Sequence, residues 1–201
     1  MKIIRRYANL IRLSAGASLL IGLGDYVLLK IGEPIGPFLF AFGLLGVCAL
    51  SLNLFTGKCG FWIEDGIPIV DLLIILAVNL VAGYGFGLLF SIIDSSIVAV
   101  AEGKVAGWNL DLEFFFKSVM CGAIMYLAVE LYRRGTTLGV LIGVPLFIFC
   151  GFQHSIANVI TMGVAGALSW TVLLCALGNF VGAIAAWALC CKVAIEPSKK
   201  K

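Results

Sequence analysis

The chain has 201 residues, of which 62% are hydrophobic and only 12% are charged, and its mean hydropathy is +1.11. A soluble domain needs far more charge than this to cover its surface, so the composition predicts an integral membrane protein and excludes nucleic-acid binders and secreted disulfide scaffolds. The net charge of +3 reports first on orientation in the bilayer and says little about a substrate.

Charge-free stretches predict where the chain crosses the bilayer, because one helical crossing needs about 20 apolar residues. Segment 72–93 has 22 residues without a charge and segment 34–57 has 24, whereas the 57 charge-free residues of 135–191 must hold two crossings. Two further apolar spans carry charges inside them or at their ends. The six predicted spans of this all-α protein, in chain order, are 7–31, 34–57, 72–93, 113–134, 136–162 and 168–191.

The first span follows several basic residues, as in a secretory signal peptide, but it outruns the apolar core of such a peptide and five more spans follow it. With six spans, an N-terminus in the cytoplasm places eleven of the 14 basic residues on the cytoplasmic side, as the positive-inside rule expects. The three on the external side are Lys30, Lys104 and Lys117. We therefore expect a multi-pass protein of the cell inner (cytoplasmic) membrane, with both termini cytoplasmic and segment 94–113 as an external loop.

The seven cysteines and Asp25 do not predict a chemical site. The cysteines are scattered without a CxxC pair, so we expect small buried hydrophobes and neither a disulfide framework, a metal site nor a cofactor. Asp25 follows Tyr7 by eighteen residues, about 27 Å along a helix, which places it near the external interface. We therefore expect Asp25 to be an interfacial carboxylate.

Polar residues deep in the apolar spans are functional candidates, because they are costly there, and they occur in matched pairs. The second span is interrupted around Phe55 and the fifth around His154. Asn79 follows Phe55 by 24 residues, and Asn179 follows His154 by 25. The two asparagines lie either at a transport site or between closely packed helices, and the sequence leaves both interpretations open.

This pairing means that the second half of the chain repeats the first. With three spans in each half, repeat one covers about 7–93 and repeat two about 113–192, in opposite orientations within a single domain, 1–201. The predicted fold is six transmembrane helices as a 3+3 inverted repeat, with helices two and five interrupted. Interruptions at corresponding positions of such a repeat point to the binding site of a transported solute.

The interruptions also indicate the charge of that solute. We expect Thr56 to cap the helix that restarts after the first break, and Ser155 or Asn158 to cap the helix after the second. Two helix N-termini directed inward from opposite membrane faces favour an anion between them.

His154 is the only histidine of the chain, and its position in the second break favours a pore residue over a packing residue. The apolar residues around it are either ordinary core or dry constrictions: Phe40, Leu44, Leu54, Phe55 and Phe147. A bare anion in such a constriction costs several kcal/mol or more, and passage as the neutral acid avoids that cost. We expect His154 to assist the proton transfer, directly or through water.

Several motifs, taken in order, resemble the formate/nitrite transporter family over nearly the whole chain. The most specific combination is HSIAN after Gly-Phe, with LFTG at the right distance upstream. The motifs are LFTG at 54–57, NLV at 79–81, Lys104, GFQHSIAN at 151–158 and GNFVG at 178–182. The resemblance implies an aquaporin-like fold, a homopentamer with one pore per subunit, and passage of small monovalent anions such as formate, nitrite, hydrosulfide, acetate or lactate.

The resemblance also implies roles for single residues. His154 and Thr56 would form the polar centre of the pore, with Asn158 supporting them, and Lys104 would draw anions into the outer vestibule. The matching constriction residues would be the aromatic Phe40 and Phe147 and the aliphatic Leu44 and Leu54.

Two positions depart from the family pattern. Gln153 stands before the histidine where many members have an acid, and this change removes a buried charge. Gly122 stands where many members place an asparagine in the fourth span, so we expect one polar pore contact to be missing. Either departure can shift the preference among anions, because the size and polarity of a pore decide its selectivity.

Two other functions stay open: a channel for small neutral solutes such as water or urea, and a non-transport membrane subunit of an enzyme complex. The chain is not expected to be an enzyme itself. His154 has only Ser155 beside it in sequence and no paired carboxylate, so a nucleophile with its base is not apparent.

Overall fold

The computed structural model describes residues 1–190, and this part of the chain is built from helices without a strand. Cys191, Lys192, Lys199, Lys200 and Lys201, which end the second predicted repeat and support the predicted orientation, lie outside the described residues. The elements are α1 (Lys2–Ile31), α2 (Ile35–Ala49), α3 (Phe55–Lys58), η1 (Cys59–Phe61), α4 (Ile69–Ile93), η2 (Ser95–Ile97), α5 (Val98–Ala106), α6 (Leu112–Arg133), α7 (Leu138–Phe149), α8 (Ser155–Val164) and α9 (Thr171–Cys190).

Each predicted span contains one helix or two. α1, α4, α6 and α9 are long and apolar enough to cross a bilayer. α2 and α3 share the second predicted span, and α7 and α8 share the fifth, so both predicted interruptions are present, at 50–54 and 150–154. The expected loop at 94–113 is wrong in part, because η2 and α5 occupy its first half; the three alanines of α5, with Glu102 and Lys104, favour a helix.

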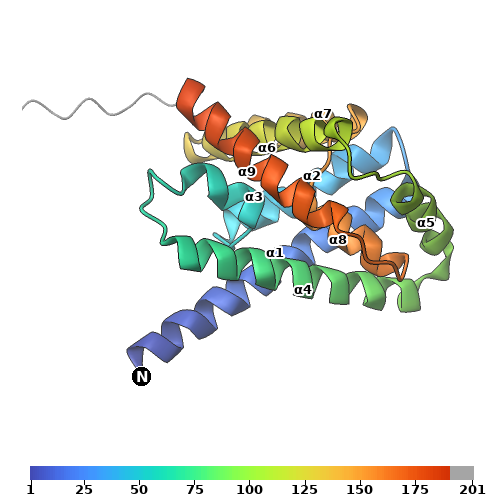
Figure 1. Ribbon diagram of the computed structural model, residues 1–201, viewed down its shortest axis with the longest axis horizontal. Coiled ribbons are helices and arrows are strands. Elements are labelled where there is room, and N and C mark those ends of the chain that lie inside the picture. The colour runs from blue at the N-terminus through green and yellow to red at the C-terminus, as the bar shows by residue number, and fades with distance from the viewer. Residues whose placement is uncertain (191–201) are drawn as a thin grey trace, which may run out of the picture.

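The helices of each half pack in the same way. α1 contacts α2 and α4, and α6 contacts α7 and α9. The halves meet where α2 packs against α7 and where α4 packs against α8. Figure 1 shows α4 along the lower edge and α6 and α7 along the upper edge, with the short helices α3 and α8 between them.

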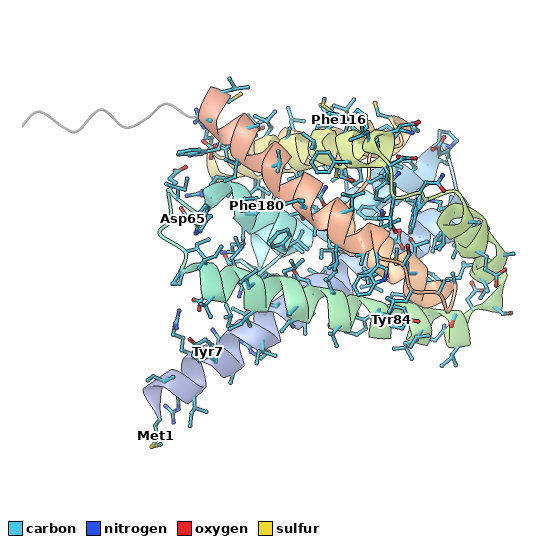
Figure 2. The ribbon with its side chains drawn as sticks, in the orientation of Figure 1. Met1, Tyr7, Asp65, Tyr84, Phe116 and Phe180 are labelled. Atoms are coloured by element: carbon cyan, nitrogen blue, oxygen red, sulfur yellow. The ribbon has the colours of Figure 1, made fainter. Side chains whose placement is uncertain are left out.

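The two ends of the helix bundle carry most of the charges. The N-terminus, the connection before α4 and the end of α9 lie at the left end in Figure 1, and α5 lies at the right end. Asp65 stands in the left-hand connection, as Figure 2 shows, and forms an ion pair with Arg133 at 2.9 Å. At the other end, Lys30 donates a hydrogen bond to Asp94 at 2.7 Å, which holds the pKa of that carboxyl well below its usual range.

The outward faces of the long helices are apolar. On α4, Val81 is 76% exposed and Ile92 is 81% exposed, and comparable large side chains cover the outer faces of the other long helices. A water-soluble protein does not expose a continuous apolar surface of this kind, whereas a lipid bilayer requires one. The chain is therefore a multi-pass membrane protein.

α6 and α9 lie almost in backbone contact. A Cβ atom on Gly122 would lie 2.0 Å from the Asn179 carbonyl oxygen, and one on Gly182 would lie 1.8 Å from the Val119 carbonyl oxygen. The expectation that Gly122 marks a missing pore contact is therefore wrong. This position faces α9, where only glycine fits.

Candidate functional site

The two interruptions begin with the same turn. α2 and α7 each end at a residue in the left-handed region, Ser51 (φ 52°) and Gly151 (φ 66°). The next amide then donates five residues back, from Leu52 to the Val47 carbonyl and from Phe152 to the Phe147 carbonyl, both at 2.9 Å. This pattern closes the end of a helix and turns the chain away from its axis. Each break is therefore a built turn with its backbone hydrogen bonds satisfied.

An asparagine from a neighbouring helix holds each break. Asn79 on α4 accepts the Phe55 amide at 2.8 Å, and donates to the carbonyls of Asn53 at 3.1 Å and Ser14 at 2.8 Å. The Asn79 side chain thus ties the start of α3 to the segment before it and to α1.

Asn179 on α9 repeats this arrangement in the second half. It accepts the Ser155 amide and donates to the carbonyls of Gln153 and Ser118, all at 2.8 Å. Both asparagines are fully buried, and the described bonds of their amides go to protein groups. Of the two interpretations left open by the sequence, the structure supports the one in which they hold helices together.

The expected helix caps are wrong. The N-cap residues are Leu54 for α3 and His154 for α8, and not Thr56, Ser155 or Asn158. The reason is that Asn79 and Asn179 accept the first helical amide of each restarted helix, which removes the need for a hydroxyl cap. His154 itself accepts the Ala157 amide through Nδ1 at 3.1 Å.

His154 and Thr56 meet between the two breaks. Their Nε2 and Oγ1 atoms lie 2.8 Å apart, and both side chains are buried. Because Nδ1 accepts the Ala157 amide, Nδ1 carries no proton, and a neutral imidazole must then carry its proton on Nε2. His154 therefore donates to the Thr56 hydroxyl. The sequence predicted these two residues as a polar centre, and the structure brings them together.

A cavity of about 410 Å³ opens on one side of this pair, and we call it the Lys104 cavity. His154, Phe40 and Phe147 line it together with three charged residues, Lys104 of α5, Asp25 of α1 and Glu33. The Phe147 ring stacks on the imidazole of His154, with 5.8 Å between ring centroids. Lys104 thus stands in the same cavity as the histidine, as predicted, although on a helix.

A second cavity of about 420 Å³ opens toward the opposite end of the molecule, and we call it the Arg133 cavity. Leu44 and Leu54 line it, together with the charged residues Lys58, Asp65 and Arg133. The Arg133 guanidinium also lies over the Phe61 ring, 4.2 Å from its centroid. The Lys104 cavity lies toward the end of the bundle that carries α5, and the Arg133 cavity toward the end that carries the connection before α4. Figure 1 shows α5 and this connection at opposite ends.

Buried apolar side chains separate the cavities. Phe40 and Phe147 lie edge to face, 6.1 Å between centroids, on the Lys104 side. Leu44 and Leu54 are fully buried on the other side. Phe55, the fifth predicted constriction residue, lies elsewhere: it packs between α4 and α9 and lines a separate apolar groove. α3 begins at Phe55, and successive side chains of a helix point in different directions around its axis. The Phe55 side chain therefore points away from that of Thr56.

Asn158 and Gln153 form a pair beside the histidine. Asn158 donates to the Gln153 side-chain oxygen at 2.9 Å, and both residues line the Lys104 cavity. The Asn158 amide nitrogen of the backbone also donates to the His154 carbonyl at 2.8 Å. Asn158 therefore supports the break that carries His154. Gln153, which stands where many members of the formate/nitrite transporter family have an acid, accepts this hydrogen bond with an uncharged amide oxygen.

Asp25 is the residue that sequence reasoning missed. Its carboxyl group is buried, it accepts a hydrogen bond from Thr161 of α8 at 2.8 Å, and it lines the Lys104 cavity. The expected interfacial carboxylate is therefore wrong. Counting from Tyr7 gives a distance along α1 but not the direction of the side chain, which points into the protein toward Thr161.

Comparison of the sequence with protein-family models found no match, and comparison with curated proteins found none either. The structure, in contrast, is similar to that of an FNT family ion channel, with 23% sequence identity, a TM-score of 0.77, and 92% of this chain and 90% of that chain covered. The chain has the fold of this channel. A pentameric formate channel with formate bound is similar over 91% of this chain and 93% of its own, with 16% identity and a TM-score of 0.70. At this identity the transport roles of single residues stay predictions.

Proposed function

We propose that this protein belongs to the formate/nitrite transporter family and is a channel for small monovalent weak-acid anions, such as formate, nitrite or hydrosulfide. The observation that carries the proposal is a pair of cavities at opposite ends of the bundle, with the buried contact between Thr56 and His154 in the region that separates them. His154 lines the Lys104 cavity, and Leu54 and Gly57, on either side of Thr56 in the sequence, line the Arg133 cavity. The fold shared with a formate channel supports the same function.

The path through the subunit runs between the two cavities. A solute passes from the Lys104 cavity between Phe40 and Phe147, meets Thr56 and His154, and leaves between Leu44 and Leu54. Lys104 in one cavity, and Lys58 and Arg133 in the other, attract an anion, whereas the residues between the cavities are apolar except for the central pair. A desolvated anion between apolar rings is costly, so the solute crosses as the neutral acid or together with a proton.

The fold prediction of a 3+3 inverted repeat belongs to this proposal. The repeated turn at Ser51 and Gly151, the repeated asparagine contacts, and the matched packing of the α1 and α6 groups support it. The similar fold of a pentameric formate channel supports a homopentamer with a pore in each subunit. The distribution of the basic residues supports the cytoplasmic location of both termini.

Flux into liposomes tests the function. Purified protein is reconstituted with a pH-sensitive dye inside, and formate, nitrite or hydrosulfide is added outside. Passage as the neutral acid acidifies the lumen, whereas passage of the bare anion creates a membrane potential without acidification. We expect acidification well above that of protein-free liposomes. Swelling in urea without acidification would favour a channel for neutral solutes, and the absence of any flux would favour a non-transport subunit.

A matched pair of phenylalanines tests the path. Phe40 and Phe147 form an edge-to-face pair between the cavities, and Phe38 and Phe149 form a similar pair, with 5.9 Å between centroids, on the lipid-facing surface. Phe40→Ala should widen the constriction and admit larger acids, whereas Phe38→Ala should leave the size limit unchanged. Equal effects of the two variants would place the path elsewhere.

A further inference from the structure

Asp25 is a buried acid in the Lys104 cavity, and the central pair does not involve it. The carboxyl group accepts one hydrogen bond, from the Thr161 hydroxyl, and Lys104 interacts with it electrostatically. Among the ion pairs of the described residues none includes Asp25. The bond from Thr161 requires only one carboxyl oxygen, so it is compatible with a proton on the other.

His154 is poorly placed to deliver a proton. Its Nδ1 atom accepts the Ala157 amide, and its Nε2 proton goes to Thr56. To become an imidazolium it would need a proton on Nδ1, where the Ala157 N–H already points. Both ring nitrogens are therefore engaged in holding the break and Thr56.

The Lys104 cavity connects Asp25 to the central pair. Ala157, Asn158 and Thr161 line the cavity from one face of α8, whose N-cap residue is His154. Thr161 lies seven residues beyond His154, about 10 Å along the helix. An anion that enters the cavity toward His154 therefore passes the carboxyl group that Thr161 holds.

Few other titratable groups face Asp25. Lys104 of α5, Glu33 after α1 and His154 line the same cavity, while α2 contributes Phe40 to the described lining and α4 contributes nothing to it. Tyr26 and Lys30 lie further along α1. Both donate hydrogen bonds to Asp94, the residue before η2, and not to Asp25. Asp25 is thus the buried carboxyl of this cavity, and Glu33 is its exposed one.

We infer that Asp25 is the proton donor and acceptor that converts a weak-acid anion into its neutral acid in the Lys104 cavity. The inference rests on the proposed function. Lys104 attracts the anion and Asp25 protonates it, while His154 and Thr56 receive the neutral acid as hydrogen-bonding groups.

The step is a simple proton transfer. The O–H bond of the Asp25 carboxylic acid breaks, a bond from the same proton to an oxygen or sulfur of the anion forms, and Asp25 becomes a carboxylate. Lys104 stabilises this carboxylate while the neutral acid moves on. A hydronium ion from the water that fills the cavity then restores the proton on Asp25, and transport in the opposite direction reverses each step.

The pH dependence of formate uptake tests the inference. If the neutral acid came only from bulk solution, uptake at constant total formate would fall about tenfold for each pH unit throughout the range above the pKa of formic acid. With Asp25 as donor, the uptake rate stops rising with falling pH once the Asp25 carboxyl group is fully protonated. Asp25→Asn should lose this levelling and slow uptake by about tenfold or more, and Asp25→Glu should restore the levelling.

Two matched controls separate proton transfer from charge and from the histidine. Glu33→Gln converts the other carboxyl group of the same cavity to an amide, so it should retain the levelling and change uptake by less than Asp25→Asn. His154→Asn should also retain it, because asparagine can accept from Ala157 and donate to Thr56. Loss of the levelling in His154→Asn, or its retention in Asp25→Asn, would assign proton transfer to another group and overturn the inference.

Infrared titration of the reconstituted protein examines Asp25 without any transport. We expect the carbonyl stretch of a protonated carboxyl group that disappears at alkaline pH, in a step that is missing from Asp25→Asn and present in Glu33→Gln. A carboxylate that stays ionised at every pH would overturn the inference even if the wild type carries formate. Wild-type liposomes that take up no weak acid would instead overturn the proposed function, and the transport role of Asp25 with it.

Discussion

The two interruptions share a scaffold and differ in chemistry. Both have the same left-handed turn, the same bond five residues back, and an asparagine that accepts the first helical amide. The N-cap position, however, is Leu54 in the first break and His154 in the second. The repeated part is thus what keeps backbone groups bonded in an apolar environment, and the polar centre takes one residue from each break, Thr56 and His154.

A second difference lies behind the asparagines. The Ser18 hydroxyl of α1 donates to the Asn79 carbonyl at 3.1 Å, whereas Gly122 of α6 lies against the Asn179 carbonyl with no room for a side chain. The first half therefore satisfies this carbonyl with a hydroxyl, and the second half brings two backbones together. Equivalent positions of the repeat can be stabilised by different interactions while the breaks stay alike.

The largest expected effect comes from removing the shared scaffold. Asn79→Ala or Asn179→Ala leaves the first helical amide of α3 or α8 without its acceptor and removes one hydrogen bond from each of two backbone carbonyls, in a buried site. The unpaired amide costs about 1 to 3 kcal/mol and each lost hydrogen bond about 1 kcal/mol, so either variant should lose about 3 kcal/mol of stability or more. Thermal unfolding in detergent, followed by size-exclusion chromatography, measures the loss.

Asn53→Ala is the matched control for the asparagine variants. Asn79 binds the carbonyl oxygen of Asn53, which alanine keeps, so this variant should be much milder. If Asn79→Ala and Asn179→Ala differed strongly from each other, the shared scaffold would not be energetically equivalent in the two halves.

The next effect separates the close helix contact from the hydroxyl contact. Gly122→Ala places a methyl group against the Asn179 backbone and should cost about 1 to 3 kcal/mol by overpacking. Ser18→Ala removes the hydroxyl that bonds the Asn79 carbonyl and, at 3.3 Å each, the Ser14 carbonyl and the Asn79 side-chain amide, and should cost about 1 kcal/mol. Gly85→Ala on α4, where a Cβ would meet open space, is the control and should not destabilise the protein. A harmless Gly122→Ala would mean that α6 and α9 can separate at little cost.

The difference at the N-cap position can be removed by one substitution. His154→Leu makes the second break like the first, and it loses both the bond from Ala157, worth about 1 kcal/mol, and the contact with Thr56. We expect formate uptake to fall by about tenfold or more, while His154→Asn retains most of it. Equal uptake by His154→Leu and wild type would show that His154 serves only to hold the helix.

A smaller effect comes from the turns themselves. Ser51 has φ 52°, a conformation that costs a residue with a Cβ about 1 kcal/mol relative to glycine. Ser51→Gly should therefore raise the unfolding temperature, and Gly151→Ala should lower it by a similar free energy. Because no atom lies within 4 Å of a Cβ on Gly151, the change would report backbone strain and not a clash. Equal unfolding temperatures in all three proteins would argue against strain at either turn.

The sequence predicts the parts of this structure that depend on local composition. Charge-free length locates the spans, and the pairing of Phe55 with Asn79 and of His154 with Asn179 locates both breaks. The meeting of Thr56 with His154 could be predicted because they occupy corresponding breaks. The transport path itself stays a prediction, supported by the two cavities.

The misassigned residues depend on contacts that are distant in sequence. The caps were misassigned because Asn79 and Asn179 reach back from other helices, and Gly122 because its neighbour is the backbone of α9. Asp25 was placed at the interface because rise per residue gives a distance along α1 but not the direction of the side chain. A polar residue in a long apolar helix is better treated as a candidate pore residue until its neighbours are known.

The smallest expected effect concerns Lys104, which α5 places in one cavity between the two halves of the repeat. Lys104→Glu should slow formate uptake about threefold or less at low salt and hardly at all at physiological ionic strength, where exposed charges are screened over about 8 Å. Lys117→Glu is the matched control, because Lys117 lies near the same end but is paired with Glu113 at 2.6 Å. Initial uptake rates at two salt concentrations measure both variants. Slowing of Lys104→Glu that is equal at both salts would contradict long-range attraction of the anion by Lys104, and equal slowing of both variants would mean that only the net charge of this end matters.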